Sequence, residues 1–215
     1  MKRIDLVKKW RLNSNRSTTK KKANTPYLFA EIRQPRSQYL AFPTLSSELR
    51  FYIPIDFLEP NIIASNQIYI IPDATLYLFG ILTSEMHMTW VKYVCGRLKS
   101  DYRYSSSIVY NNFPFPETVT DKQKQTVETC AQAVLDTRAK YPDSSLADLY
   151  DPLIMPPDLI KAHQKLDKAV DLCYRLQPFS SELNRIEYLF ELYEKLTAPL
   201  LSTTKQKRTK RKNPK

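Results

Sequence analysis

Glycine is the residue that this sequence most clearly lacks. Its 215 residues contain two glycines, Gly80 and Gly96, and each stands alone. A fold that holds a nucleotide or a methyl-donor cofactor needs a glycine-rich turn where the backbone approaches the ligand. Two isolated glycines form neither such a turn nor a Walker loop. We therefore expect this chain to bind no nucleotide-like cofactor by itself.

Cysteine and histidine are also scarce. Cys95, Cys130 and Cys173 lie far apart without a C-x-x-C pair, and His87 and His163 each stand alone on an expected helix. This spacing favours reduced thiols of a cytoplasmic protein over disulfides or zinc ligands. It also favours packed or surface histidines over catalytic ones. The E-x-K element of carboxylate–lysine nucleases does not occur. The sequence thus predicts neither a metal site nor a catalytic residue.

Long apolar runs are absent as well. No stretch approaches the roughly 18 residues of a membrane span, and the basic start MKRIDLVKKW lacks the apolar stretch of a secretory signal. We therefore expect no membrane partner and a cytoplasmic location. Hydrophobic residues make up 42% of the chain, which is enough for a globular core at this length.

Positive charge is present in excess but is unevenly placed. Of the net charge of +11, residues 1–22 carry +8 and residues 205–215 carry +7, so the body between them carries −4. Basic ends are typical of proteins with a polyanionic partner, nucleic acid above all. Ends of this kind also occur simply as solubilising, disordered segments, and both interpretations stay open here.

Residues 26–117 have the pattern of a mixed, β-rich domain. Short aromatic and β-branched runs alternate with proline and turn residues, and they predict strands at Tyr27–Arg33, Tyr39–Phe42, Arg50–Phe57, Gln67–Ile71, Tyr77–Leu82 and Ile108–Tyr110. One helix interrupts them. Thr83 or Ser84 can cap it, and it ends near Gly96. A loop held by this helix would then present the residues that follow.

Residues 118–201 have helical periodicity instead. Thr120 and Gln123 fit a capping box, and Pro157 suits a first helical position. Helices are predicted from Thr120 to about Tyr141 and over Ser144–Tyr150, Asp158–Leu176 and Glu182–Leu196. The fold class is therefore α+β. We divide the chain into a polar basic lead-in (1–25), a β-rich domain (26–117), a helical C-terminal domain (118–201) and a disordered basic tail (202–215).

The stretch from Cys95 to Glu117 carries the candidate site. Lys99 can donate to guanine O6 and N7, and Asp101 can accept from N4 of the paired cytosine, so the two could read one G·C pair. Arg103 could contact guanine in a bidentate manner or bind phosphate. The plainer alternatives are an ordinary solvated loop and a surface ion pair between Lys99 and Asp101.

A long run of this sequence resembles a known family. Residues 48–117 (ELRFYIPIDFLEPNIIASNQIYIIPDATLYLFGILTSEMHMTWVKYVCGRLKSDYRYSSSIVYNNFPFPE) look like the C-terminal part of the MmeI-like type IIL restriction–modification enzymes and adenine-specific DNA methyltransferases. SLADLYDPLIMPPDLIKAHQKLDKAVD and RIEYLFELYEKLTAPL continue the likeness. The resemblance implies the end of a target-recognition domain followed by a helical C-terminal domain.

The resemblance also implies roles for individual residues. In the family, the loop matching Leu98–Tyr104 lies in the DNA major groove. The positions matching Lys99 and Asp101 read a base pair, with Arg103 in the same surface. Further residues are expected to contact the DNA backbone or to support the loop, namely Arg97, Ser100, Tyr102, Tyr104 and Ser105.

Large parts of the family pattern are missing upstream of Met1, including the nuclease and methyltransferase domains. We therefore expect a truncated, sequence-specific DNA-recognition portion of a DNA (adenine-N6) methyltransferase or restriction–modification enzyme, without catalysis of its own. S-adenosylmethionine, and Mg²⁺ if a nuclease is present, would belong to the full-length enzyme. Partners would be double-stranded DNA and the methyltransferase portion encoded upstream. The alternatives are a protein-interaction module and a general nucleic-acid-binding module, including one that stacks RNA bases on its 14 tyrosines.

Overall fold

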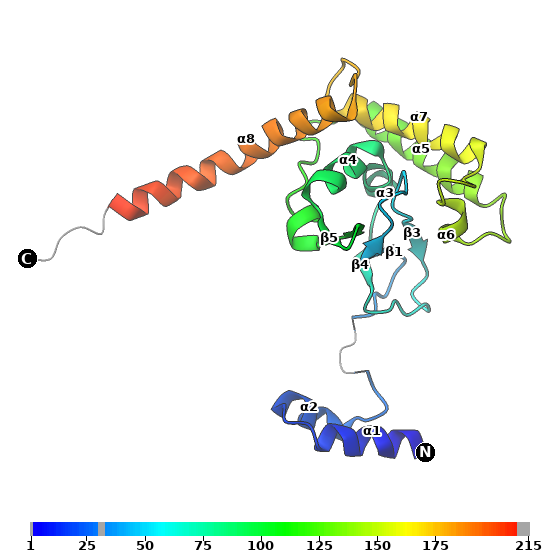
Figure 1. Ribbon diagram of the computed structural model, residues 1–215, viewed down its shortest axis with the longest axis vertical. Coiled ribbons are helices and arrows are strands. Elements are labelled where there is room, and N and C mark those ends of the chain that lie inside the picture. The colour runs from blue at the N-terminus through cyan, green and yellow to red at the C-terminus, as the bar shows by residue number, and fades with distance from the viewer. Residues whose placement is uncertain (1, 30–32, 210–215) are drawn as a thin grey trace, which may run out of the picture. The chain divides into compact units, whose positions relative to one another are not determined.

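The computed structural model describes residues 2–29 and 33–209, with side chains to residue 198 (Figure 1). The chain forms two compact units, residues 1–36 and residues 37–215. In the first unit, α1 (Lys2–Leu12), α2 (Ser17–Lys21) and the 3-10 turn η1 (Lys22–Asn24) follow one another. Helix α1 has Asp5 in its first turn and Lys9 and Arg11 in its last.

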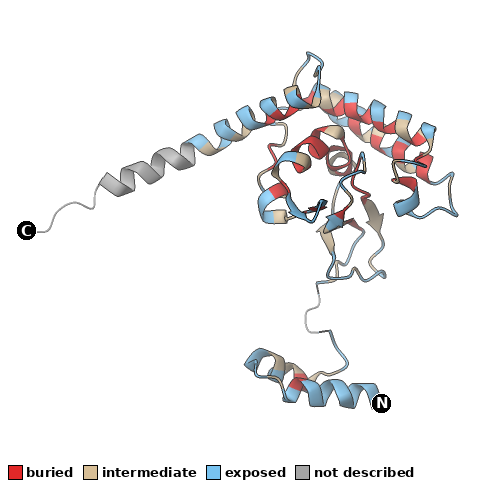
Figure 2. Cartoon of the chain, viewed as in Figure 1, coloured by how far each residue is buried: buried red, intermediate tan, exposed pale blue. Residues whose placement is uncertain are grey.

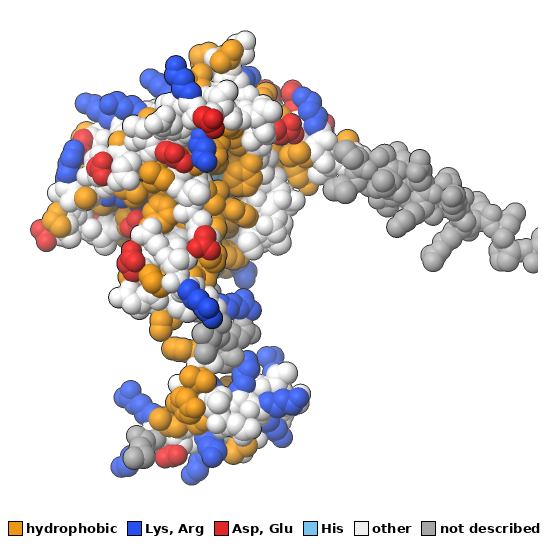
Figure 3. Space-filling view, turned by 180° about the vertical axis from the view of Figure 1, so that it is seen from behind, with side chains coloured by type: hydrophobic (Ala, Val, Ile, Leu, Met, Phe, Trp, Pro, Cys, Tyr) orange, Lys and Arg blue, Asp and Glu red, His pale blue; other side chains and the backbone are white. Residues whose placement is uncertain are grey.

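Arg11 holds the first unit together. Its buried guanidinium donates to the carbonyls of Lys22, Thr25 and Leu28, each at 2.8 Å. Lys and Arg side chains cover much of this unit, with hydrophobic side chains among them (Figure 3). The predicted strand Tyr27–Arg33 is wrong where it can be followed, because residues 27–29 form a turn and coil. Residues 30–32 lie outside the described part of the chain.

Two small antiparallel sheets form the β part of the second unit. One has the order β3 (Asp56–Leu58), β1 (Tyr39–Pro43), β4 (Ile68–Pro72), and the other has the order β2 (Leu45–Ser46), β6 (Asp101–Arg103), β5 (Gly96–Leu98). Thr44 joins them, since its amide donates to Gln67 and its carbonyl accepts from Tyr104. The strands predicted at Tyr39–Phe42 and Gln67–Ile71 are confirmed. Of Arg50–Phe57, only the end is a strand.

Two predicted strands are wrong. Tyr77–Leu82 lies in the helix α3 (Leu76–Leu82), which the Thr75 hydroxyl caps by accepting from the Leu78 amide. The second half of this helix is buried on all sides. Its apolar residues therefore show neither the 3.6-residue period of a helix nor the two-residue period of a strand. Ile108–Tyr110 lies in the π-helical turn Ser106–Tyr110, where the Trp90 indole donates to the Val109 carbonyl at 3.0 Å.

The remaining helices agree with the prediction in position, apart from the end of α8, and the predicted caps are present. They are α4 (Glu85–Val94), α5 (Asp121–Arg138), α6 (Leu146–Leu149), α7 (Pro157–Tyr174) and α8 (Glu182–Thr209). Ser84 caps α4, Thr120 and Gln123 form the capping box of α5, and Pro157 opens α7. The α+β fold class is confirmed.

The end of α8 differs from the prediction. We expected a stop at Leu196, before Pro199, and disorder from residue 202, whereas the helix continues to Thr209. Lys, Gln and Arg, which follow Pro199, are favourable helix formers, so the composition does not force the chain out of the helix. Residues 210–215 lie outside the described part.

One core runs through the second unit. It extends without a break from Leu40 in β1 to Leu189 in α8, and the red, buried residues of α3, α4, α5 and α7 face one another (Figure 2). Packing is therefore continuous across residue 118, where the sequence predicted a domain boundary. None of the described helices is long and apolar enough to cross a membrane.

Candidate nucleic-acid interface

The candidate residues lie on a β-hairpin rather than on an irregular loop. Strands β5 and β6 pair in antiparallel register, with Gly96 opposite Arg103 and Leu98 opposite Asp101. This register leaves Lys99 and Ser100 as a two-residue turn. Helix α4 ends at Val94, and a single residue, Cys95, separates it from β5. The hairpin is thus tied directly to a buried helix, as the sequence suggested, but it is more regular than expected.

The turn places Lys99 in an unusual backbone conformation. Its φ is +55°, in the left-handed region that glycine normally occupies at the first central position of a tight hairpin. A side chain at this position costs about 1–2 kcal/mol of backbone energy. The lysine therefore occupies the tip of the hairpin although glycine would fit more easily.

Alternation along β6 separates the candidate residues into two groups. Asp101 and Arg103 are exposed, whereas Tyr102 and Tyr104 are each 3% exposed. Successive side chains of a strand point to opposite faces, so Asp101 and Arg103 share the outer face beside the exposed Lys99. Among the described residues, Lys99 and Asp101 form no ion pair with each other. The surface ion pair considered from the sequence is therefore not formed.

Arg97 braces the turn from the other face. Its guanidinium lies 4.1 Å from the centre of the Tyr102 ring and donates to the Ser100 carbonyl at 2.8 Å. It also forms an ion pair with Glu48 at 3.4 Å. Burial raises the pKa of Tyr102, which the Arg97 charge partly opposes. These contacts occupy Arg97 as a support of the hairpin.

Tyr104 anchors the hairpin to the core. Its hydroxyl lies 3.0 Å from His87 Nε2, and His87 Nδ1 lies 2.9 Å from the Leu82 carbonyl. Only a protonated Nδ1 can donate to that carbonyl, so Nε2 accepts from Tyr104. Burial lowers the pKa of His87 to about 4, although the bond to Leu82 opposes the shift. His87 is therefore a neutral, packed histidine, as predicted.

The side chains of Ser105 and Asn112 contact the π-helical turn beyond β6. The Ser105 and Ser107 hydroxyls lie 3.0 Å apart. The Asn112 amide donates to the carbonyls of Ser107 and Ile108 at 3.0 and 2.9 Å. Both polar side chains therefore hold the π-helical turn that follows the hairpin. In the part of the chain that the structure describes, no group of three His, Cys, Asp or Glu side chains could hold a metal ion.

The structure adds two residues that sequence reasoning missed. The Glu48 amide lies 3.4 Å from Asp101 Oδ1, while its carboxylate pairs with Arg97. Leu45 lies directly opposite Arg103 and is 40% exposed. Both precede the hairpin by about fifty residues, and no local pattern in the sequence could have shown that β2 pairs with β6.

Comparison with known proteins identifies the family to which this chain belongs. Residues 1–117 match the family model described as "MmeI, target recognition domain", and residues 119–201 match "MmeI, C-terminal domain". Together these matches cover most of the chain. The chain belongs to the MmeI family.

Two MmeI relatives give the scale of the match. "DNA methyltransferase A" of Bacillus subtilis (strain 168) is 45% identical over 195 residues, covering 91% of this chain and 22% of the relative. The solved structure of the type IIL restriction–modification enzyme MmeI in complex with DNA aligns with a TM-score of 0.85 and 48% identity, covering 91% of this chain and 26% of that one. The chain thus spans about a quarter of the length of these relatives.

Proposed function

We propose that this chain recognises a specific sequence in double-stranded DNA by placing the β5–β6 hairpin in the major groove. The observation that carries the proposal is the outer face of that hairpin, where Lys99, Asp101 and Arg103 are exposed together above two buried tyrosines. A two-stranded ribbon fits the major groove of B-DNA. The solved MmeI relative is a complex with DNA, which supports the same use of this domain here.

Each exposed side chain has a distinct role in this proposal. Lys99 donates to guanine O6 and N7, and Asp101 accepts from N4 of the paired cytosine, so the two read both halves of one G·C pair. Arg103 contacts a neighbouring guanine or a phosphate. Each good contact to a base is worth about 1–3 kcal/mol of discrimination. In the same proposal, Ser100 contacts the DNA backbone from the turn.

Catalysis belongs to other parts of the longer relatives in this proposal. Adenine-N6 methylation needs S-adenosylmethionine, and the residues of this chain do not fit that donor. Gly80 is buried in α3 and Gly96 lies in β5, so neither glycine forms a turn that could bring the backbone to a cofactor. The methyltransferase portion, with Mg²⁺ if a nuclease is present, would supply the chemistry.

The test exchanges the two reading charges. The variant Lys99→Glu with Asp101→Arg should prefer C·G where the wild type prefers G·C, because acceptor and donor change places. The measurement is selection from a random duplex library with the purified chain, followed by the same exchange in a fusion to the methyltransferase portion, read as methylated sites.

A matched control changes a residue after the hairpin and leaves both the hairpin and the reading pair Lys99 and Asp101 intact. Ser107→Ala removes an exposed hydroxyl next to Ser105 and should leave the selected sequence unchanged. If the double variant selected the same base pair as the wild type, the assignment of Lys99 and Asp101 to base reading would be wrong.

A second function has one observation in its favour. Leu49 and Phe51 of the recognition domain and Leu153 and Ile154 after α6 are 53–92% exposed, and Leu49 and Leu153 line one surface hollow. Exposed apolar groups of this kind are typical of protein contacts. A protein-interaction module would bind the methyltransferase portion through these residues. Leu153→Asp should weaken that binding, and unchanged binding would show that the hollow is not the contact.

A further inference from the structure

Helix α4, which leads into the hairpin, is held at its first residue by the C-terminal domain. The Glu85 amide donates to Asp167 Oδ1 at 2.7 Å, and the Tyr52 hydroxyl donates to Oδ2 at 2.6 Å. Asp167 lies in α7 and is 5% exposed. The first amides of a helix have no partner within the helix, so the Asp167 side chain supplies an acceptor from the other domain.

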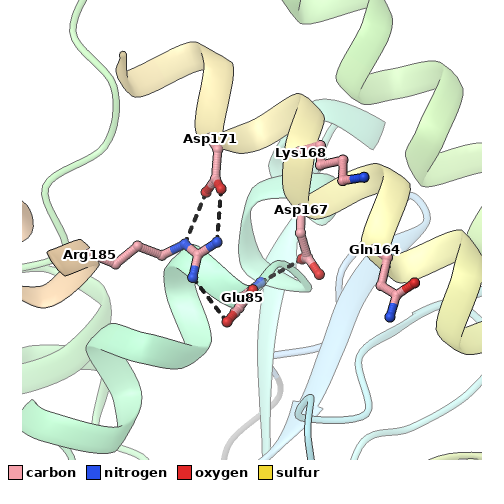
Figure 4. Close-up of a pocket in the computed structure, with 6 residues that line it drawn as sticks. All are labelled: Glu85, Gln164, Asp167, Lys168, Asp171 and Arg185. Atoms are coloured by element: carbon pink, nitrogen blue, oxygen red, sulfur yellow. Dashed lines mark hydrogen bonds and ion pairs between the residues drawn. The ribbon is translucent and has the colours of Figure 1, made fainter. Parts of the chain in front are cut away.

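Arg185 of α8 ties the same end of α4 to two helices. Its guanidinium lies 2.9 Å from the Glu85 carboxylate and donates from Nε and Nη2 to Asp171 at 3.1 and 2.8 Å. Figure 4 shows Arg185 between these two acids, with Asp167 beside them. Arg185 is 8% exposed. A buried, bidentate pair of this type has a fixed geometry, so it sets the spacing of α4, α7 and α8.

The other end of α4 is held by α8. Lys92 forms an ion pair with Glu182, and the Trp90 ring packs against Phe190 and Tyr193 with centroids 5.5 and 5.7 Å apart. Beyond this point α4 passes directly into β5, and the Arg97 guanidinium reaches back to the Lys92 carbonyl at 3.4 Å. Any tilt of α4 would therefore move the hairpin.

We propose that the C-terminal helical domain positions the base-reading hairpin through α4, with Asp167 and Arg185 as the positioning residues. The part of this proposal that concerns DNA recognition rests on the proposed function. Neither residue touches DNA in this scheme. They keep α4 in the one orientation that presents Lys99, Asp101 and Arg103 to base edges, and their loss frees the hairpin to move without changing its own residues.

The experiment compares four variants of the full chain, of which Arg185→Lys removes the bidentate pair with Asp171. Asp167→Ala removes the acceptor at the α4 N-terminus, whereas Asp167→Asn keeps an oxygen that can accept from the Glu85 amide. Asp158→Ala is the matched control. Asp158 lies on the same helix and accepts from the Tyr141 hydroxyl at 2.7 Å, and it pairs with Lys140, but these partners belong to the C-terminal domain.

The first measurement is amide hydrogen exchange in the absence of DNA. In Asp167→Ala, the first turn of α4 and the hairpin should exchange about tenfold faster, since the hydrogen bond that holds the α4 N-terminus is lost. Helix α5 should be unchanged, and Asp167→Asn should restore most of the protection. Asp158→Ala should leave the hairpin as in the wild type. A uniform rise over the whole unit, or a hairpin whose exchange does not change, would overturn the proposal.

The second measurement is the ratio of affinities for the selected and an unrelated duplex. Asp167→Ala and Arg185→Lys should lower this ratio about tenfold with little change in affinity for the unrelated duplex, because phosphate contacts do not need the hairpin in register. An unchanged ratio would contradict the proposal. If the wild type itself selects no sequence, the proposed function fails, and the exchange experiment still decides whether α4 positions the hairpin. Should Asp167→Ala fail to fold, Arg185→Lys takes its place as the variant that loses a contact, and Asp167→Asn remains the variant that keeps one.

Discussion

Single residues at the hairpin combine backbone strain with an exposed charge. Lys99 has a φ of +55° at the turn, and Ser100 beside it does not have a positive φ. Strain of this kind persists where the surrounding structure enforces it. Here the surroundings are the β5–β6 register and Arg97, which holds the Ser100 carbonyl. The protein thus accepts a less favourable turn in order to keep a lysine at its tip.

Replacement of Lys99 should separate these two effects. Lys99→Gly should raise the free energy of unfolding by up to about 1 kcal/mol because glycine adopts this φ without penalty, and it should abolish the preference for G·C. Ser100→Gly is the control, with no gain in stability expected. Urea unfolding and duplex selection measure the two outcomes. A Lys99→Gly variant that is less stable than Ser100→Gly would contradict the strain argument.

Asp167 has a further property at the residue scale. Burial raises its pKa from 3.8 to about 7, the charges of Glu85 and Asp171 add to the rise, and the bonds from Tyr52 and the Glu85 amide oppose it. The folded state therefore retains a proton that the unfolded state loses near pH 4. Its contribution to stability is full below about pH 4 and is lost as the pH rises through about 7.

This titration predicts a pH-dependent difference between Asp167→Asn and the wild type. The variant stays neutral at every pH, so its unfolding free energy should rise relative to the wild type between pH 5 and pH 8. His87 and His163, whose pKa values burial also shifts, are present in both proteins and cancel in the comparison. Urea unfolding at the two pH values measures the difference, and a constant difference would show that Asp167 does not titrate in this range.

Among the elements, α3 shows most directly how packing sets secondary structure. The helix lies against α5, and a Cβ added to Gly80 would lie 2.7 Å from Val127 Cγ1 and 3.3 Å from the Ala131 Cβ. The glycine therefore permits a close approach between a helix of the recognition domain and a helix of the C-terminal domain. Gly96 is different, since its added Cβ would meet only the Arg103 carbonyl oxygen at 3.7 Å.

The two glycines therefore predict opposite responses to alanine. Gly80→Ala should lower the unfolding free energy by about 1–3 kcal/mol through overpacking, although alanine is the better helix former. Gly96→Ala should have little effect. Adding Val127→Ala to Gly80→Ala should make the loss smaller than the sum of the two single changes, because the overlapping methyl is removed. Thermal and urea unfolding of the four variants test this. Additive losses would mean that α3 and α5 do not meet as closely as the structure places them.

At the scale of the whole molecule, the recognition and C-terminal domains share one core. Arg138 of α5 donates to the Ile55 carbonyl at 2.7 Å and to the Tyr150 hydroxyl, and the Tyr52 ring stacks on His163 at 4.0 Å. The contacts of Arg138 with Ile55 and of Tyr52 with His163 join residues on either side of residue 118. Neither domain, as the sequence divides them, keeps its buried surface without the other.

Truncation should therefore fail at the apparent boundary and succeed elsewhere. Residues 37–201 should fold with a cooperative unfolding transition, because residues 37–215 form one compact unit. Residues 1–117 should not, because α3 and α4 would expose their buried faces. Circular dichroism during urea titration distinguishes the two. Cooperative unfolding of residues 1–117 would show that the recognition domain has a core of its own.

The sequence by itself determined the features that neighbouring residues encode. The cap at Thr120, a cap at Thr83 or Ser84, the periodicity of α5 and α7, the α+β class and the family resemblance all follow from residues a few positions apart or from one long motif. It also brought attention to Lys99, Asp101 and Arg103, whose use in base reading stays a prediction.

Only the tertiary structure decided that α3 is a helix, that Lys99 to Arg103 lie on a hairpin, and that Tyr102 and Tyr104 are buried beneath it. It also showed that Asp167 holds α4 and Tyr52 from 82 and 115 residues away along the chain. The physical reason is that an apolar run, a turn and a buried carboxylate take their conformation and charge from what packs against them, and those partners are distant in sequence.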